Sequence, residues 1–166
     1  MFDTTPVAPT LDRLFRELTE GAHHPRGAFI LNSGDAGLLA SLDRLSAAEA
    51  SQAVDGGGTI AAHAQHLRYG LSLMNRWARD GGNPFADAHW DDAWRVGAVD
   101  DTEWAGIRQG LREEADAWTR VLATSRTAAP VELAGMIASI AHVAYHLGAI
   151  RQAARAARGP RQGTFG

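Results

Sequence analysis

A chain of 166 residues is long enough for one domain with a substantial core and too short for two, so we expect a single domain over 1–166. Hydrophobic residues make up 45% and charged residues 21%, a balance typical of a folded globular protein and unlike a disordered chain. The net charge of -3 supplies no long-range attraction to polyanions, so neither nucleic acid nor an anionic membrane is an expected partner.

The chain contains no cysteine, which limits its chemistry. It can form no disulfide and offers neither a thiolate nucleophile nor a thiolate metal ligand, so any metal must be held by His, Asp or Glu. The N-terminal segment MFDTTPVAPTLDRL lacks the basic and apolar regions of a secretion signal. We therefore expect a cytoplasmic protein.

Residues 1–34 predict a short leading helix followed by a loop. Thr10 can cap LDRLFRELTE, in which apolar residues recur at helical spacing, and Gly21 can end that helix. A proline and two glycines interrupt the following HHPRGAFILNSGD, so this segment is expected to be a loop. Its His23 and His24 are expected to be solvated, although a loop histidine beside an active site can shuttle protons.

Residues 35–158 predict a core of four helices, because each long segment carries apolar residues at helical spacing or clear end signals. The GGGT cluster supplies an N-cap at Thr59 for the second helix, and Asp101 or Thr102 can cap the third. Pro130 opens the fourth helix, and a Gly-Pro pair ends it. The predicted helices span 35–50, 60–79, 101–123 and 130–158, and residues 159–166 form a tail.

A long connection over about 81–101 joins the second and third helices and permits a non-meandering topology. Trp90 and Trp94 lie four residues apart within it, which predicts a helical turn that packs as a lid. The five tryptophans of the chain are expected in the core and at the helix ends rather than around a ligand. The predicted fold class is all-α, a four-helix bundle with a long crossover connection plus a short N-terminal helix.

The run from Leu133 to Ile150 is uncharged and about long enough to cross a bilayer. Two histidines, a serine, a tyrosine and several small residues make it too polar to lodge in lipid unaided. We therefore expect a helix inside a bundle and no membrane partner. Three neighbouring helices would leave part of such an all-round apolar helix uncovered, so we predict a homodimer.

Histidine pairs on two of the predicted helices form the candidate functional site. His142 and His146 lie one turn apart on the fourth helix, and His63 and His66 both lie on the inward side of the second. Three convergent imidazoles with an open fourth position describe a catalytic metal site, and here four histidines compete for three places. Each pair could equally consist of core histidines that hydrogen-bond their neighbours.

The segments TIAAHAQHLRYGLSLMNRW and HVAYHLGAIRQ resemble those of the DinB-like (DinB/YfiT) four-helix metalloproteins, and the resemblance covers about 35–158. It implies that His66, which is followed by leucine, is one metal ligand. It also implies that His142 and His146, in a segment similar to the family's HxxxHxGQI, are the other two ligands. Ala149 stands where the family usually has Gln. His63 is additional to the family pattern, and we interpret it as a core histidine or a supporting partner of a ligand.

The resemblance implies a metal-dependent enzyme that holds a divalent ion such as Zn²⁺ or Ni²⁺, with water or substrate completing the coordination. Such an ion lowers the pKa of bound water, or polarises a substrate oxygen or thiol. Members of the family are associated with hydrolysis and with thiol-dependent transfer, so the expected partners are a small-molecule substrate and a low-molecular-weight thiol. Family members are also often dimeric. The alternative is a non-catalytic, stress-associated binding or scaffold protein whose histidine cluster is structural or empty.

Overall fold

The computed structural model of the chain describes residues 1–22, 27–53 and 57–160. The expectations for His23 and His24, and for the tail beyond residue 160, lie outside these residues. The described part is mostly helical, as the all-α prediction requires. Its elements are β1 (Phe2–Asp3), α1 (Ala8–Glu20), α2 (Gly37–Asp43), α3 (Ala47–Ala50), α4 (Ile60–Asp80), α5 (Trp90–Trp94), α6 (Asp101–Ala123), β2 (Thr127–Ala128), α7 (Pro130–Ala153) and a 3₁₀ turn, η1 (Arg155–Ala157).

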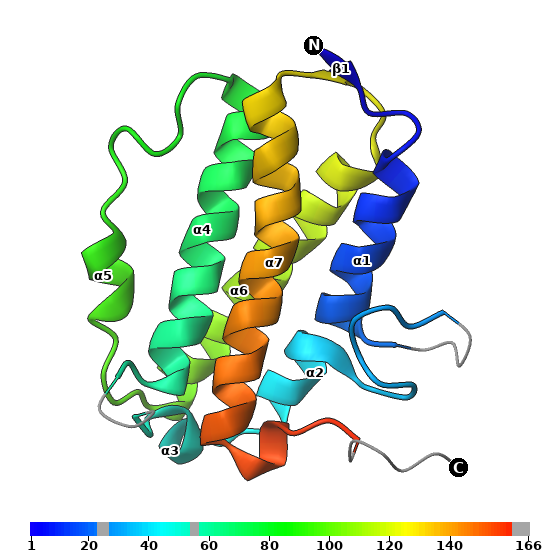
Figure 1. The fold of residues 1–166 in the computed structure, drawn as a ribbon. Helices are drawn as coiled ribbons and strands as arrows, with labels where there is room; N and C mark the ends of the chain where they lie inside the picture. Colours follow the sequence, from blue (N-terminus) through cyan, green and yellow to red (C-terminus); the bar gives the residue numbers. More distant parts are fainter. Residues whose placement is uncertain (23–26, 54–56, 161–166) are drawn as a thin grey trace.

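Four long helices, α1, α4, α6 and α7, lie side by side (Figure 1). Helix α6 packs against α1 and α4, and α7 packs against the same two helices. One apolar cluster runs through all four, with Phe15, Leu67, Leu111 and Ile150 among its fully buried members. Burying side chains of this size is the main favourable term for the fold, at about 1.5–3 kcal/mol for each.

The starts of α4 and α6 follow from their capping residues. The Thr59 hydroxyl accepts a hydrogen bond of 3.0 Å from the backbone N–H of Ala62, as predicted for the second helix. Asp100 caps α6 by accepting from the N–H of Glu103, whose carboxylate accepts in return from the N–H of Asp100. The cap of α6 therefore lies one residue before the two candidates at 101 and 102.

The structure corrects the prediction of a first bundle helix over 35–50. That segment forms two short helices, α2 and α3, which lie at one end of the long helices (Figure 1). The break occurs because Ser46 and Glu49 form a capping box that starts a new helix. The predicted short leading helix is present as α1, of 13 residues, but it packs against α6 and α7 in the place expected for the helix over 35–50. It begins at Ala8 without a cap from Thr10.

Two smaller corrections concern the ends of the chain. The fourth helix ends at Ala153 rather than near residue 158, and η1 follows it. No strand was expected, but β1 and β2 form an antiparallel pair of two residues each, in which Phe2 lies opposite Ala128. Strands this short carry no alternating pattern that a sequence could reveal. They attach the N-terminus to the connection between α6 and α7.

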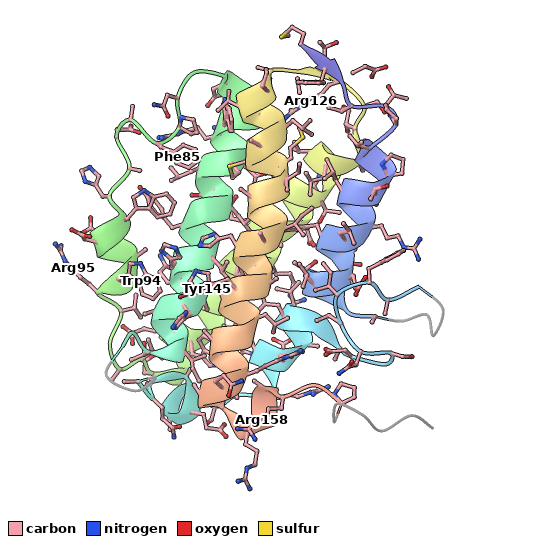
Figure 2. All side chains as sticks on the ribbon, viewed as in Figure 1. Phe85, Trp94, Arg95, Arg126, Tyr145 and Arg158 are labelled. Carbon is pink, nitrogen blue, oxygen red and sulfur yellow. The ribbon has the colours of Figure 1, made fainter. Side chains whose placement is uncertain are left out.

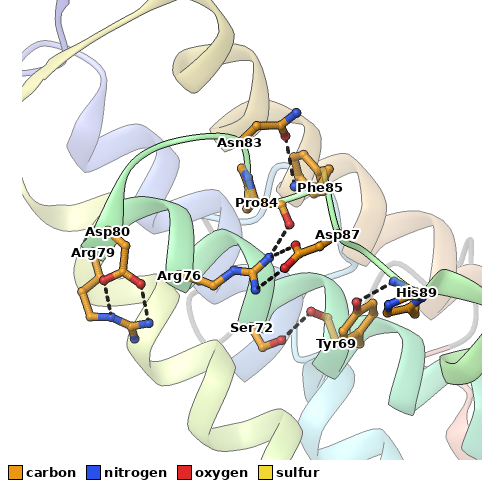
Figure 3. Close-up of polar contacts among 10 residues, drawn as sticks. All are labelled: Tyr69, Ser72, Arg76, Arg79, Asp80, Asn83, Pro84, Phe85, Asp87 and His89. Carbon is orange, nitrogen blue, oxygen red and sulfur yellow. Dashed lines mark hydrogen bonds and ion pairs between the residues drawn. The ribbon is translucent and has the colours of Figure 1, made fainter.

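The connection between α4 and α6 runs along the outer side of α4 and contains α5 (Figure 1), so the predicted helical turn at Trp90 and Trp94 is confirmed. Polar contacts attach it to α4 (Figure 3). The Arg76 guanidinium donates to the backbone carbonyl of Pro84 and to the Asp87 carboxylate, each at 2.6 Å. The backbone N–H of His89 donates to the Tyr69 hydroxyl at 2.9 Å.

Helix α7 is long and apolar enough to cross a membrane by length and composition alone, with a mean hydropathy of 1.5 over its most apolar window. Within that window 39% of the residues are buried against the other helices. Its outer side exposes Val131, Ile137 and Tyr145. The expected incomplete cover of this helix is therefore present in the described chain.

Candidate metal centre

The candidate site lies between α4 and α7, which run antiparallel. His66 on α4 faces His142 on α7. His63, one turn before His66, faces His146, which lies one turn after His142. Because the two helices run in opposite directions, the same alignment of α4 with α7 brings His66 next to His142 and His63 next to His146. His63, His66 and His146 are buried, and His142 is half-buried.

Three imidazole nitrogens converge on one point. The Nε2 atom of His142 lies 2.8 Å from Nε2 of His146 and 3.1 Å from Nε2 of His66. Within the described part of the chain, these three residues form the one group whose ligand atoms all lie close enough to hold a metal ion, within 4.8 Å of one another. Two ligands of tetrahedral zinc lie about 3.3 Å apart, given Zn–N bonds of about 2.0–2.1 Å.

The hydrogen-bonding capacity of His142 fits a shared cation. A neutral imidazole Nε2 offers either one lone pair or one N–H, so it can satisfy only one of its two close nitrogen neighbours by a hydrogen bond. A single ion can accept one lone pair from each of the three nitrogens. The donor set therefore fits a divalent metal with His66, His142 and His146 as ligands.

His63 supports this group from outside it. Its Nδ1 lies 2.8 Å from Nδ1 of His146, on the opposite side of that ring from the converging Nε2 atoms. A histidine that ligates through Nε2 carries its proton on Nδ1, which then needs an acceptor. The His63 Nδ1 can accept a hydrogen bond from that N–H and so fix the orientation of the His146 ring. The interpretation of His63 as a supporting partner agrees with this geometry.

His66 lacks the same support. Its Nδ1 is buried and has no hydrogen-bonding partner among the described residues. A buried N–H without an acceptor costs about 1–3 kcal/mol. Ala149, which stands where the DinB-like pattern usually has Gln, is half-buried and offers no side-chain acceptor.

Burial keeps the histidines neutral, as metal ligands must be. Desolvation is the largest cause that lowers the pKa of each of the four, since a charged imidazolium is disfavoured away from water. Repulsion among the rings adds to this effect in two of them. The pKa of His66 falls to about 4 and that of His146 to about 3. At neutral pH the lone pairs are therefore free for an ion.

The helical turn α5 covers the histidines. The Trp94 ring stacks on His66 with centroids 4.5 Å apart and meets His63 edge-on at 5.0 Å. Figure 2 shows Trp94 on the side of α5 that faces α4, whereas Arg95 extends away from the helices. Gly58 makes room for this indole, because a Cβ atom there would lie 2.9 Å from Cε3 of Trp94. The loop glycine thus lets a lid form over the site.

Four of the five tryptophans divide into a core pair and a pair on the connection between α4 and α6. Trp104 and Trp118 are fully buried, and their indole N–H groups donate to the Leu45 carbonyl and the Ser139 hydroxyl, each at 2.8 Å. Trp90 and Trp94 instead contact the His66 ring. The four-residue spacing of these two predicted a lid but not what it covers.

A cavity of about 360 Å³ adjoins the histidines between α4 and α7. His142 belongs to its wall, so the cavity adjoins the three-histidine group at one of its members. The other lining residues are Leu67, Gly70, Leu71, Met74, Trp77, Phe85, Trp90, Val131, Ala134, Gly135, Ala138, Ser139 and Val143. The sequence predicted apolar residues on the inward sides of these helices. It could not distinguish residues that line a cavity from residues that pack against another helix.

Comparison of the chain with protein-family models, with curated proteins and with solved structures finds no match. The resemblance to DinB-like proteins therefore stays a prediction that rests on the quoted segments.

Proposed function

We propose that this protein is a metal-dependent enzyme of the DinB-like type, in which His66, His142 and His146 hold one divalent ion, zinc or nickel. The observation that carries the proposal is the convergence of three neutral Nε2 atoms from two helices, beside a cavity that can admit a small molecule. When bound, the ion would act as a Lewis acid on a water molecule or on a substrate oxygen or thiol. The reaction class is hydrolysis or thiol-dependent transfer.

The ligand set favours an anionic reacting group. Three neutral imidazoles leave the two positive charges of the ion uncompensated, and no carboxylate belongs to the group among the described residues. A thiolate, or a group that loses a proton on binding, would neutralise part of that charge. This supports a low-molecular-weight thiol as a partner. His63 orients His146, and Trp94 limits the access of bulk water.

We also propose the four-helix bundle of the DinB-like family as the fold, because the four long helices share one core and a long connection separates α4 from α6. We further propose that nucleic acids and anionic membranes are not partners, because the net charge of -3 does not attract polyanions.

A specific observation supports the alternative, a non-catalytic binding or scaffold protein. The nitrogen contacts of 2.8 and 3.1 Å are hydrogen-bond distances, shorter than the spacing of about 3.3 Å around tetrahedral zinc. Histidines that hydrogen-bond one another would need no ion. Such a cluster would help to hold α4 against α7.

Elemental analysis of untagged protein, combined with circular dichroism, separates the two functions. We expect close to one divalent ion per chain in the wild type, and loss of most of it in His66→Ala, His142→Ala and His146→Ala with helicity largely kept. Helical variants that all keep their metal would disprove this site. If instead no ion binds and all three variants unfold, the histidines serve the core and the scaffold function is correct.

A further inference from the structure

We propose that the cavity between α4 and α7 holds an uncharged, apolar part of the substrate, an aromatic ring or a branched alkyl chain, while the reacting group lies at the three histidines. This inference rests on the proposed function and adds the substrate class to it.

The size of the cavity suits a compact organic molecule. An apolar cavity of about 150 Å³ can hold a benzene ring. The cavity here measures about 360 Å³, which leaves room for a ring with a substituent. Its aromatic walls come from Trp77 on α4 and from Phe85 and Trp90 on the connection that follows it. Flat walls of this kind favour an aromatic or a branched aliphatic group.

The lining excludes a charged body. No Asp, Glu, Lys or Arg belongs to the wall, so a carboxylate or phosphate in the part of the cavity away from the histidines would face apolar groups and find no cationic side chain. The Ser139 hydroxyl is already used, because it donates to the Met136 carbonyl at 2.7 Å and accepts from the Trp118 indole at 2.8 Å. Little in the cavity remains to bind a strongly polar group.

Gly70 joins the cavity to the histidines. A Cβ atom at this position would lie 3.8 Å from Cε1 of His142 and 3.7 Å from Cζ3 of Trp90. The space between these two rings therefore depends on the absence of a side chain, and one methyl group would already fill it to van der Waals contact. This space is where the cavity meets the His142 ring.

The outer wall is held in place rather than left free. Arg76 binds the backbone carbonyl of Pro84 and the carboxylate of Asp87, and these two residues flank Phe85 (Figure 3). The Phe85 ring stacks near that of Trp90, with centroids 6.1 Å apart. The connection therefore presents its aromatic residues to the cavity in a fixed arrangement, as a binding site requires.

The test measures the affinity of the zinc-loaded protein for two hydroxamates that share one metal-binding group. Benzohydroxamic acid carries a phenyl ring, and acetohydroxamic acid carries only a methyl group. We expect the phenyl compound to bind at least about tenfold more tightly, because its ring is removed from water. We expect 4-carboxybenzohydroxamic acid, charged at the far end of the ring, to lose at least about tenfold relative to the phenyl compound.

Two variants locate the effect. Ala138→Trp adds a bulky side chain from an exposed position in the cavity wall, and Gly70→Ala places one methyl group in the space beside His142, in van der Waals contact with that ring. Both should lower the ratio of the two affinities, Ala138→Trp close to one, while zinc content stays unchanged. Ala141→Trp is the matched control, since Ala141 is exposed on the same helix but does not line the cavity. It should keep the wild-type ratio.

The outcomes separate this inference from the function on which it rests. Failure of the wild type to bind zinc overturns both. Zinc binding with equal affinity for the phenyl and methyl compounds overturns the apolar substrate class alone. The same holds if the phenyl compound keeps its advantage in both cavity-filling variants, because its ring would then lie elsewhere.

Discussion

His63 hydrogen-bonds a candidate ligand without joining the group that faces the ion. Partners in this position commonly contribute 10–100-fold to metal affinity, because they hold the ligand ring in its productive orientation. We predict that His63→Ala binds close to one equivalent of zinc when zinc is in excess, with an affinity about 10–100-fold lower than that of the wild type.

Competition with a chromophoric chelator measures both quantities. His66→Ala provides the comparison, because it should lose stoichiometry as well as affinity. If His63→Ala loses its zinc and His66→Ala retains it, the ligand on α4 is His63 rather than His66.

Protonation of the histidines should destabilise the metal-free protein in acid. An unfolded histidine has a pKa of about 6.5, whereas the folded pKa of His66 is about 4 and that of His146 about 3. Between these values the unfolded chain binds protons that the folded chain does not, so stability is highest above about pH 7 and falls as the pH falls toward 4. The shift of His66 alone corresponds to roughly 3 kcal/mol over that range.

Urea denaturation of protein treated with a chelator, at a series of pH values, tests this expectation. His66→Asn should show a flatter fall in the free energy of unfolding between pH 7 and pH 4. His89→Asn replaces an exposed histidine and should follow the wild type. An equally steep curve in His66→Asn would show that the acid sensitivity arises outside the cluster.

A buried ion pair connects the loop before α2 to the end of α7. The Arg151 guanidinium donates to both carboxylate oxygens of Asp35, at 2.6 and 2.8 Å, and Asp35 also accepts from the N–H of Gly37. The side chains of Asp35 and Arg151 are only 2% and 17% exposed, so loss of Asp35 would leave the Arg151 charge largely buried without a counter-ion. We predict that Asp35→Ala lowers the free energy of unfolding by about 3–5 kcal/mol.

Asp43→Ala is the matched control for this ion pair. Asp43 also binds arginines, Arg108 and Arg112, but its side chain is 43% exposed. Exposed pairs contribute about 0–1 kcal/mol, so this variant should remain close to the wild type in chemical denaturation. Similar losses in both variants would contradict a special role for the buried pair.

Local signals made some elements predictable and others not. The start of α4 at Ile60 could be predicted because Thr59 caps it within three residues. The break between α2 and α3 was missed although Ser46 and Glu49 spell a capping box, because the leucines before it suggested one continuous stripe. The end of α7 was placed too late because the Gly-Pro stop lies beyond η1.

The candidate site shows the same limit. Histidines four residues apart, or three, predict which side of a helix they share, and this was enough to place both pairs on inward sides of their helices. The choice of His66, His142 and His146 as the three ligands came from the resemblance to DinB-like proteins. The position of α5 over those histidines depends instead on contacts between distant residues, such as Arg76 with Asp87 and Tyr69 with His89. No local sequence pattern carries that information. The lid at Trp90 and Trp94 could therefore be predicted, but not its position over the histidines.

Among residues 1–22, 27–53 and 57–160, no other element covers the outer side of α7. Val131, Ile137 and Tyr145 are 66%, 54% and 71% exposed. Monomeric proteins rarely leave such large apolar side chains together on one helix, and a second copy of the same helix offers a matching surface. Val131 also lines the cavity beside the histidines, so a second copy placed there would narrow the entrance to the site.

We predict that the protein is a homodimer at micromolar concentration and that Ile137→Glu makes it monomeric, because a carboxylate at the centre of an apolar interface loses its hydration without a partner. Light scattering measures the mass, and circular dichroism should show the same helicity in both forms. Ala105→Glu places the same charge at an exposed position on α6 and should stay dimeric. A monomeric wild type would refute the homodimer, and binding of that monomer to phosphatidylcholine vesicles, abolished in Ile137→Glu, would assign this side of α7 to lipid instead.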